Sequence, residues 1–173
     1  MNEKNFQRAI GTPSYRQQFI DKLDLGESSS YIGTVEYDPV ANVSFLMKTL
    51  STTSPRRRSK IIVAPASFYY HSKFQDFLST LIDHEGYHAK ENYFYKRTKR
   101  KDFHDWIIDN TFLFFQGLKK GRKLLSQKRE AENNLIHYKR EVRAYSNQLR
   151  KSEARGISSD YKNLTEERRT RYS

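Results

Sequence analysis

The stretch that decides the fold is LIDHEGYHAKE, residues 81–91, which contains the pentapeptide HEGYH. In that pentapeptide His84 is followed by Glu85, by two further residues and then by His88. Histidines four positions apart lie on one face of a helix, so both imidazoles can bind one metal ion only if the segment is helical. The pentapeptide therefore predicts a metal-binding helix, provided that its surroundings support helix formation.

The surrounding sequence does predict a helix, over residues 72–97. Its apolar residues recur at spacings of three and four, as in an amphipathic helix; they are Phe74, Phe77, Leu78, Leu81 and Ile82. His84 and His88 continue this stripe toward the core, where an imidazole without a partner is costly and a metal ion is a natural partner. Gly86 disfavours helix by about 1 kcal/mol, so either it makes room for a close neighbour or the segment is less helical.

Catalytic zinc usually takes three protein ligands and a water, so a third ligand is needed. In metzincins a glycine and a histidine follow three and six residues after the second histidine. Glu91 and Phe94 occupy those positions here, which excludes that class. Glu91 is also about 10 Å of helix rise away from His84, too far to share its ion. The third ligand should therefore come from another helix.

The best candidate for the third ligand is Glu141, in the segment KREVRAYSNQL (residues 139–149). Glu141 lies beside the apolar ridge of a predicted helix. One turn later, the small side chain of Ala144 would let the two helices approach closely. His137 and His104 are the reserve candidates.

HEGYH, the strand-then-helix order before it and the residues from Glu141 to Tyr145 resemble the gluzincin metallopeptidases. In that family a glutamate on a later helix completes the site of the HExxH helix. The resemblance implies a zincin-like fold, a peptide or protein substrate, and Zn²⁺ held by His84, His88 and Glu141.

A zinc ion in such a site keeps one position open for water and lowers the pKa of that water toward neutrality. Glu85 would act as general base, taking a proton from the water and passing it to the leaving amine. The developing oxyanion needs a further donor, and Tyr145, His137 and His104 are the candidates. Asp83, or an acidic residue on a neighbouring helix, is expected to orient the imidazoles.

The part of the chain before this helix predicts a small β-sheet. Residues 12–26 have the signals of a helix, and residues 30–37 and 42–47 flank a turn-like DPVA, which predicts a hairpin. KIIVAPA, residues 60–66, predicts a third, buried strand. In gluzincins an edge strand aligns the substrate backbone, and either of the last two strands could have that role.

The part of the chain after this helix predicts further helices, over residues 102–118 and 124–155. His71 is expected to be an ordinary residue at a helix start. The fold class is therefore α+β, with the sheet before most of the helices. We expect residues 1–155 to form a single zincin-like domain, and residues 156–173 to be a polar tail or a short peripheral helix.

The composition limits the remaining functions. The 173 residues include no cysteine, which excludes disulfides and thiolate metal sites. No apolar run is long enough to span a bilayer and the N-terminus lacks a signal-peptide pattern, so we expect a cytoplasmic protein without a membrane span. A second Glu-x-x-His motif is absent, which excludes a di-iron carboxylate bundle.

The net charge of +12 provides the competing interpretation. Basic residues cluster at 55–60, 96–101 and 119–129, and the second cluster is interleaved with aromatic residues. Such clusters favour an anionic partner such as nucleic acid. The alternatives to a peptidase are therefore a basic nucleic-acid-binding protein, in which HEGYH is incidental, and a zincin-like interaction protein without catalysis.

Overall fold

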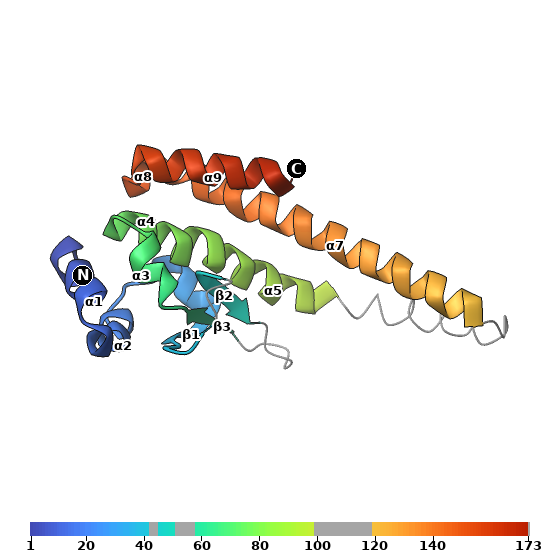
Figure 1. Cartoon of the computed structure of the whole chain (residues 1–173), viewed down its shortest axis with the longest axis horizontal. Helices are drawn as coiled ribbons and strands as arrows, with labels where there is room; N and C mark the ends of the chain where they lie inside the picture. Colours follow the sequence, from blue (N-terminus) through green and yellow to red (C-terminus); the bar gives the residue numbers. More distant parts are fainter. Residues whose placement is uncertain (42–44, 51–57, 99–118, 173) are drawn as a thin grey trace.

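A three-stranded sheet lies beneath a long helical run in the computed structural model of the chain, which describes residues 1–41, 45–50, 58–98 and 119–172 (Figure 1). The fold class is α+β, as predicted. The sheet order is β1-β3-β2, and the strands are β1 (Ile32–Tyr37), β2 (Met47–Leu50) and β3 (Ser59–Val63). Among the described residues, no helix combines the length and the apolarity needed to cross a bilayer.

The predicted hairpin between residues 30–37 and 42–47 is not formed by the described residues of these two segments, and residues 42–44 lie outside the described part of the chain. β1 and β2 do not pair with each other: β3 lies between them, parallel to β1 and antiparallel to β2. The sequence of β3, SKIIV, is the most apolar of the three, and the central position suits it because neighbours cover both of its edges. β2 is therefore left at an edge of the sheet.

The helical run from Phe74 to Thr98 covers one face of the sheet. It consists of α4 (Phe74–Leu78), the π-helical segment η3 (Ser79–Glu85) and α5 (Gly86–Thr98). At the end of the π segment, the N–H of Gly86 donates to the carbonyl of Leu81, five residues back. π-turns of this kind often occur at functional sites. HEGYH spans the junction between η3 and α5.

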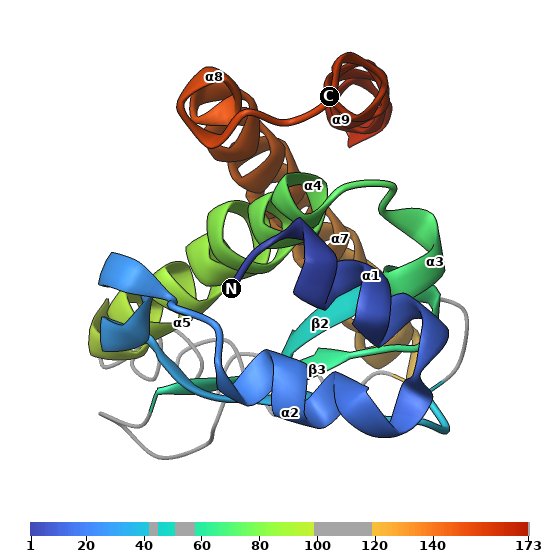
Figure 2. The ribbon, with the colours of Figure 1, turned by 90° about the vertical axis from the view of Figure 1, so that its left-hand side faces the viewer.

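A second helical layer lies on the side of this run that faces away from the sheet (Figure 2). It contains α7 (Lys119–Arg150), the short α8 (Ser152–Arg155) and α9 (Ser159–Tyr172). Gly156, with a φ of 67°, ends α8 in the left-handed conformation and lets the chain reverse. The order sheet, HEGYH helix, α7 brings a residue of α7 within reach of His84 and His88.

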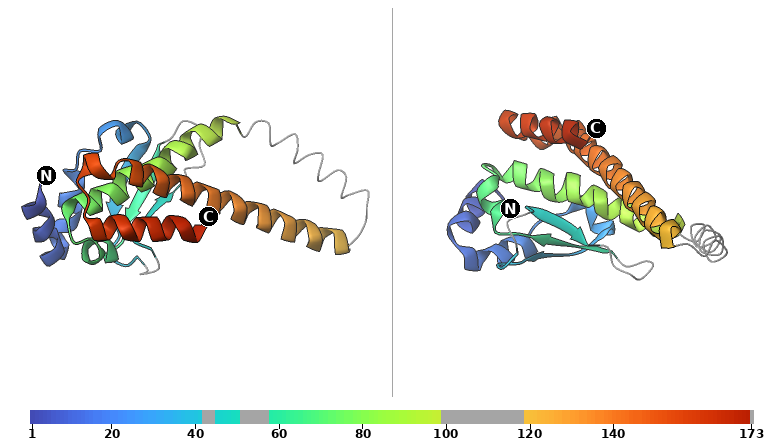
Figure 3. Two further views of the ribbon diagram at one scale, coloured as in Figure 1. Left: turned by 90° about the horizontal axis from the view of Figure 1, so that it is seen from above. Right: turned by 45° about the vertical axis from the view of Figure 1, so that its right-hand side comes forward.

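The C-terminal segment is a helix, not a loose tail. α9 lies alongside α7 (Figure 3), and its Tyr161 and Thr165 are buried. Of the two structures expected for this segment, the helix is the one formed. The reason is that a few buried residues suffice to dock an otherwise polar helix against a neighbour.

The N-terminal segment adds two helices that pack an aromatic core against the sheet. α1 (Glu3–Gly11) was not predicted; the side chain of Asn2 caps it by accepting from the Asn5 amide. The helix predicted over residues 12–26 is shorter, with a 3₁₀ turn, η1 (Pro13–Tyr15), followed by α2 (Arg16–Asp21). A second 3₁₀ turn, η2 (Gly26–Ser30), leads into β1. The fully buried aromatic residues of this core are Phe6, Phe19, Phe68 and Phe77.

His71 is not a helix-start residue. It follows the end of α3 (Ala66–Tyr70) and is almost fully buried. Its Nδ1 lies 2.6 Å from the Ser67 carbonyl, so Nδ1 carries the proton and donates. Its Nε2 therefore accepts, from the Thr80 hydroxyl at 2.8 Å. His71 is thus a core histidine with both ring nitrogens satisfied. The predicted helix 102–118, with His104, lies outside the described residues.

Candidate metal centre

His84 and His88 lie side by side on the buried face of the HEGYH helix. Their ring centroids are 4.9 Å apart, and their exposed fractions are 6% and 8%. Gly86, between them, sits against the 3₁₀ turn before β1, where an added Cβ would lie 3.0 Å from the Ser28 hydroxyl. Of the two explanations for Gly86, the structure therefore shows the first: glycine makes room for a close neighbour within a helix.

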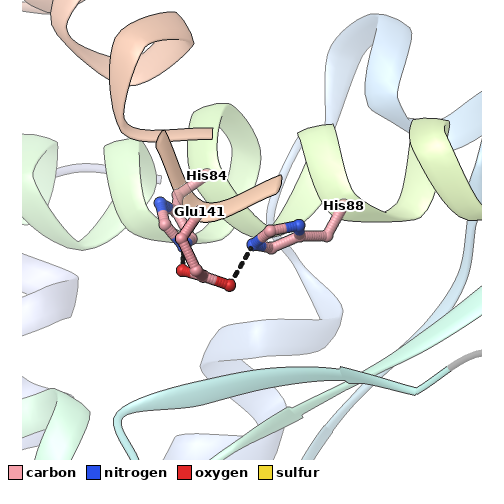
Figure 4. Close-up of side chains that lie close together, drawn as sticks. All are labelled: His84, His88 and Glu141. Atoms are coloured by element: carbon pink, nitrogen blue, oxygen red, sulfur yellow. Dashed lines mark ion pairs between the residues drawn. The ribbon is translucent and has the colours of Figure 1, made fainter. Parts of the chain in front are cut away.

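The carboxylate of Glu141 on α7 lies against both imidazoles (Figure 4). Its Oε2 is 3.4 Å from Nε2 of His84, and its Oε1 is 3.1 Å from Nε2 of His88. Burial raises the pKa of Glu141, but hydrogen bonds from His84 and His88 lower it by more, so the pKa lies well below its usual value. Ala144, one turn further on, is fully buried, in keeping with a close approach of the two helices.

The geometry of these three residues fits a tetrahedral metal ion. Their ligand atoms all lie within 4.8 Å of one another. Ligands about 2.1 Å from a tetrahedral zinc are about 3.4 Å apart. Each imidazole Nε2 lies at about this distance from one of the two oxygens of Glu141, at 3.4 Å for His84 and 3.1 Å for His88. Two imidazole nitrogens and one carboxylate oxygen are also a donor set that zinc accepts. The group could therefore hold a metal without a large rearrangement.

His137 does not belong to this group. It lies one turn before Glu141 on α7, with Nδ1 3.8 Å from Oε1, and its side chain is 58% exposed. Among the described residues, the group whose ligand atoms lie within 4.8 Å of one another contains His84, His88 and Glu141 and not His137. The structure thus places Glu141, and not His137, between the two histidines of the HEGYH helix.

Glu85 is buried, but its side chain points toward the sheet and not into the His84–His88–Glu141 group. The hydroxyl of Thr49, on edge strand β2, lies 2.7 Å from Oε2 of Glu85 and 3.0 Å from its backbone oxygen. The hydrogen bond from Thr49 to the carboxylate of Glu85 holds this side chain next to the candidate ligands His84 and His88, outside the candidate ligand group. Sequence reasoning missed Thr49, because nothing local links a polar residue of an edge strand to a helix 36 residues later.

Tyr145, four residues after Glu141 on α7, packs against the His84 side of the three-residue group. Its ring centroid is 4.3 Å from that of His84, and the ring stacks on Tyr172 of α9 at 6.0 Å. Burial raises the pKa of Tyr145 well above its usual value, an effect that the charge of Arg168 only partly offsets. The hydroxyl is therefore protonated at neutral pH and able to donate a hydrogen bond.

The expectation that Asp83 orients the imidazoles is wrong. Its fully buried carboxylate binds Arg155 of α8 and lies 3.6 Å from the ammonium group of Lys151. No hydrogen bond reaches Nδ1 of His84 from the described residues, although that atom is buried. Asp83 instead joins helices, because a buried carboxylate is stable only when cations or donors surround it.

A cavity of about 1170 Å³ opens beside the three converging residues. One wall is β2 and the loop before it, from Phe45 to Thr49, and the opposite wall is formed by α7 and α9. His84, Glu85 and His88 line it together. The candidate metal centre is therefore reachable by a ligand that lies along the sheet edge.

Three comparisons, with protein-family models, with curated proteins and with solved structures, found no match for this chain. The interpretation of the site therefore rests on its residues and their geometry.

Proposed function

We propose that this chain is a zinc-dependent metallopeptidase with a zincin-like fold. The observation that carries the proposal is the position of Glu141, whose two carboxylate oxygens face Nε2 of His84 and Nε2 of His88 at tetrahedral-ligand separations. Glu85, which follows His84 in the chain, lies beside this group, and its carboxylate accepts a hydrogen bond from Thr49 of β2. Metal-assisted hydrolysis needs three ligands for the metal ion and a neighbouring carboxylate that is not a ligand.

Bound zinc would supply a Lewis acid that polarises the substrate carbonyl and acidifies water. Glu85 would take the proton from the attacking water and deliver it to the leaving amine. The Thr49 hydrogen bond holds the Glu85 carboxylate in place for both transfers. Tyr145, protonated and next to His84, would donate to the developing oxyanion.

The substrate would lie along β2. In the antiparallel pair of β2 and β3, the Leu46 carbonyl accepts from the Ala64 amide, so residue 46 belongs to a hydrogen-bonded pair. Hydrogen-bonded and non-hydrogen-bonded pairs alternate along an antiparallel strand, so Met47 and Thr49 belong to non-hydrogen-bonded pairs. The backbone N–H and C=O groups of these two residues therefore point away from β3. An extended peptide that pairs with these groups would cross the cavity next to Glu85.

The two alternatives, a basic nucleic-acid-binding protein and a zincin-like protein without catalysis, stay predictions. Most side chains of the three basic clusters lie outside the described residues. One that is described, Lys60, is held by Glu36 at 2.5 Å on the sheet surface. No contact within the described part of the chain favours either alternative over the peptidase.

The test is zinc-loaded chain incubated with a random peptide pool, with cleavage followed by mass spectrometry. We expect cleavage by the wild type and none above background by Glu85→Gln, while both bind about one zinc per chain. The matched control is Glu153→Gln, at an exposed position of α8, which should leave cleavage unchanged. Zinc binding without any cleavage would leave the non-catalytic alternative and overturn the peptidase proposal.

A further inference from the structure

Within the described residues, one arginine of the cavity wall has no carboxylate partner. Arg140 is bound by Glu91 at 3.1 Å, and Arg171 by Glu167 at 2.6 Å. Arg168, on α9, makes no ion pair within the described part of the chain and is only partly exposed. An unpaired guanidinium in a half-buried position is poorly solvated, so it favours an anion.

The groups around Arg168 are neutral hydrogen-bond donors. Its guanidinium lies 4.9 Å above the ring of Tyr70, whose buried hydroxyl has no hydrogen-bond partner in the described residues. Tyr145 and Arg168 both line the cavity. The hydroxyl of Tyr161, by contrast, is already used by Thr80 and Gln148.

This set of side chains matches one chemical class of ligand. A guanidinium provides a flat fork of donors that fits a carboxylate, and an unused tyrosine hydroxyl can add a further hydrogen bond. The carboxylates that line the cavity, Glu85 and Glu141, are both committed to the candidate metal centre. No acidic side chain of the described cavity wall is therefore left to neutralise Arg168.

We propose that Arg168, with Tyr70, binds a carboxylate of the peptide substrate, from its C-terminus or from an acidic side chain. This inference rests on the proposed peptidase function and adds the substrate class to it. Arg168 lines the same cavity as His84 and Glu85, so a substrate bound at the candidate metal centre could reach it with its carboxylate.

The direction of the strands indicates on which side of that bond the carboxylate lies. Tyr70 belongs to α3, which begins three residues after Val63, and Val63 is the partner of Met47 at the start of β2. A substrate paired antiparallel to β2 has its C-terminal side at this end of the strand. For a substrate in this antiparallel orientation, the carboxylate would belong to the C-terminal side of the cleaved bond.

The test uses zinc-loaded Glu85→Gln chain, which keeps the cavity but lacks the general base, immobilised and mixed with three random hexapeptide pools. The first pool lacks Asp and Glu and ends in a free carboxylate; the second lacks them and ends in an amide. The third ends in an amide but contains Asp and Glu. We expect the first or the third pool to be retained at least about tenfold better than the second, because a charge-assisted hydrogen bond to the carboxylate provides a difference of this size. Which pool is retained identifies the source of the carboxylate.

Second-site variants in the same background assign the preference to one residue. Arg168→Gln should abolish it and Arg168→Lys should keep part of it. Arg171→Gln removes an equal charge one turn away, already neutralised by Glu167, and should leave the preference intact. Equal retention of the three pools, retention of none, or a preference that survives Arg168→Gln would overturn the inference.

Cleavage of the same pools by the wild type separates this inference from the proposed function. A carboxylate preference in binding, lost in Arg168→Gln, but without cleavage by the wild type would keep the subsite and reject the peptidase. Cleavage without any such preference would keep the peptidase and reject the subsite.

Discussion

Arg155 binds the carboxylate of Asp83 with two hydrogen bonds, from Nε to Oδ2 at 3.0 Å and from Nη2 to Oδ1 at 2.9 Å. Asp83 immediately precedes His84, and its backbone oxygen accepts a further hydrogen bond from Asn147 of α7. Glu141 lies on the same α7, less than two turns earlier. The contacts that dock α7 and α8 on the HEGYH helix thus also set the distance between the histidines and the glutamate.

Asp83→Asn should lower the free energy of unfolding by about 3 kcal/mol, because it leaves Arg155 without a counter-charge in a largely buried position. It should also weaken zinc binding, since the two ligand-bearing helices lose part of their docking. Urea denaturation and zinc titration measure the two effects. Arg143→Ala, which breaks a half-exposed pair with Glu91, should cost less than about 1 kcal/mol. Equal losses in both variants would argue against a docking role for Asp83.

Zinc binding should depend on three residues. We expect about one zinc per chain in the wild type, and an affinity at least about 100-fold lower in His84→Ala, His88→Ala and Glu141→Ala, because each removes a direct ligand. Competition with a chelating dye measures the affinity. His137→Ala, one turn from Glu141 and exposed, should bind zinc as the wild type does. A loss in His137→Ala as large as in Glu141→Ala would contradict the assignment.

Thr49→Val should lower the kcat of peptide cleavage about tenfold and leave KM and zinc content almost unchanged. The substitution keeps the shape of the side chain but removes the hydroxyl that holds the Glu85 carboxylate. Thr49→Ser retains the hydroxyl and should restore most of kcat. If KM rises instead, in both variants alike, then Thr49 acts through the substrate-binding strand and not through Glu85.

The effects of Gly86→Ala and Ser28→Gly on the free energy of unfolding should not be additive. Alanine at 86 gains about 1 kcal/mol of helix propensity, but its Cβ would lie 3.0 Å from the Ser28 hydroxyl oxygen. The change in the free energy of unfolding caused by Gly86→Ala should therefore be more stabilising by about 1 kcal/mol in the Ser28→Gly background than in the wild type. Thermal unfolding of the four variants measures this difference. Gly11→Ala, which has no atom within 4 Å of the added Cβ, should show no coupling to Ser28.

The stability of the fold should fall as the pH is lowered from about 6.5 to about 4, in part through His71. Burial lowers the pKa of His71 from 6.5 to about 4, outweighing its hydrogen bond to Ser67. The unfolded chain therefore binds the proton more tightly, so the stability present above pH 6.5 is lost as the pH falls through this window, by about 3 kcal/mol. His71→Asn should show a shallower pH dependence in urea denaturation. An unchanged slope would mean that other groups cause the loss.

Much of the HEGYH helix could be predicted from local periodicity alone. The three-four spacing of Phe74, Phe77 and Leu81 was sufficient to predict a helix with His84 and His88 on its buried side, and both are buried there. Glu141 could be found because it lies on a helical stripe with the small Ala144. These features depend on residues within a few turns of one another, where the repeat of the helix sets which side chains share a face.

Pairings between distant segments could not be predicted in this way. Strand order was missed because the alternation of apolar residues shows that a strand exists but not which strand lies beside it. The Thr49–Glu85 and Asp83–Arg155 contacts join residues 36 and 72 positions apart, so no spacing rule connects them. His71 was misjudged for the same reason, since Thr80 satisfies it from another helix.

By itself, then, the sequence determined the helix that carries His84, Glu85 and His88, the absence of thiolate ligands, and a glutamate stripe on a later helix. Only the tertiary structure decided that Glu141 meets both imidazoles and that β2 is the edge strand beside Glu85. It also decided that Arg168 lines the cavity without an ion pair to any described residue. The physical reason is that periodicity is a property of neighbouring residues. The distance between two helices depends on how buried side chains such as Asp83 and Ala144 fit across the interface.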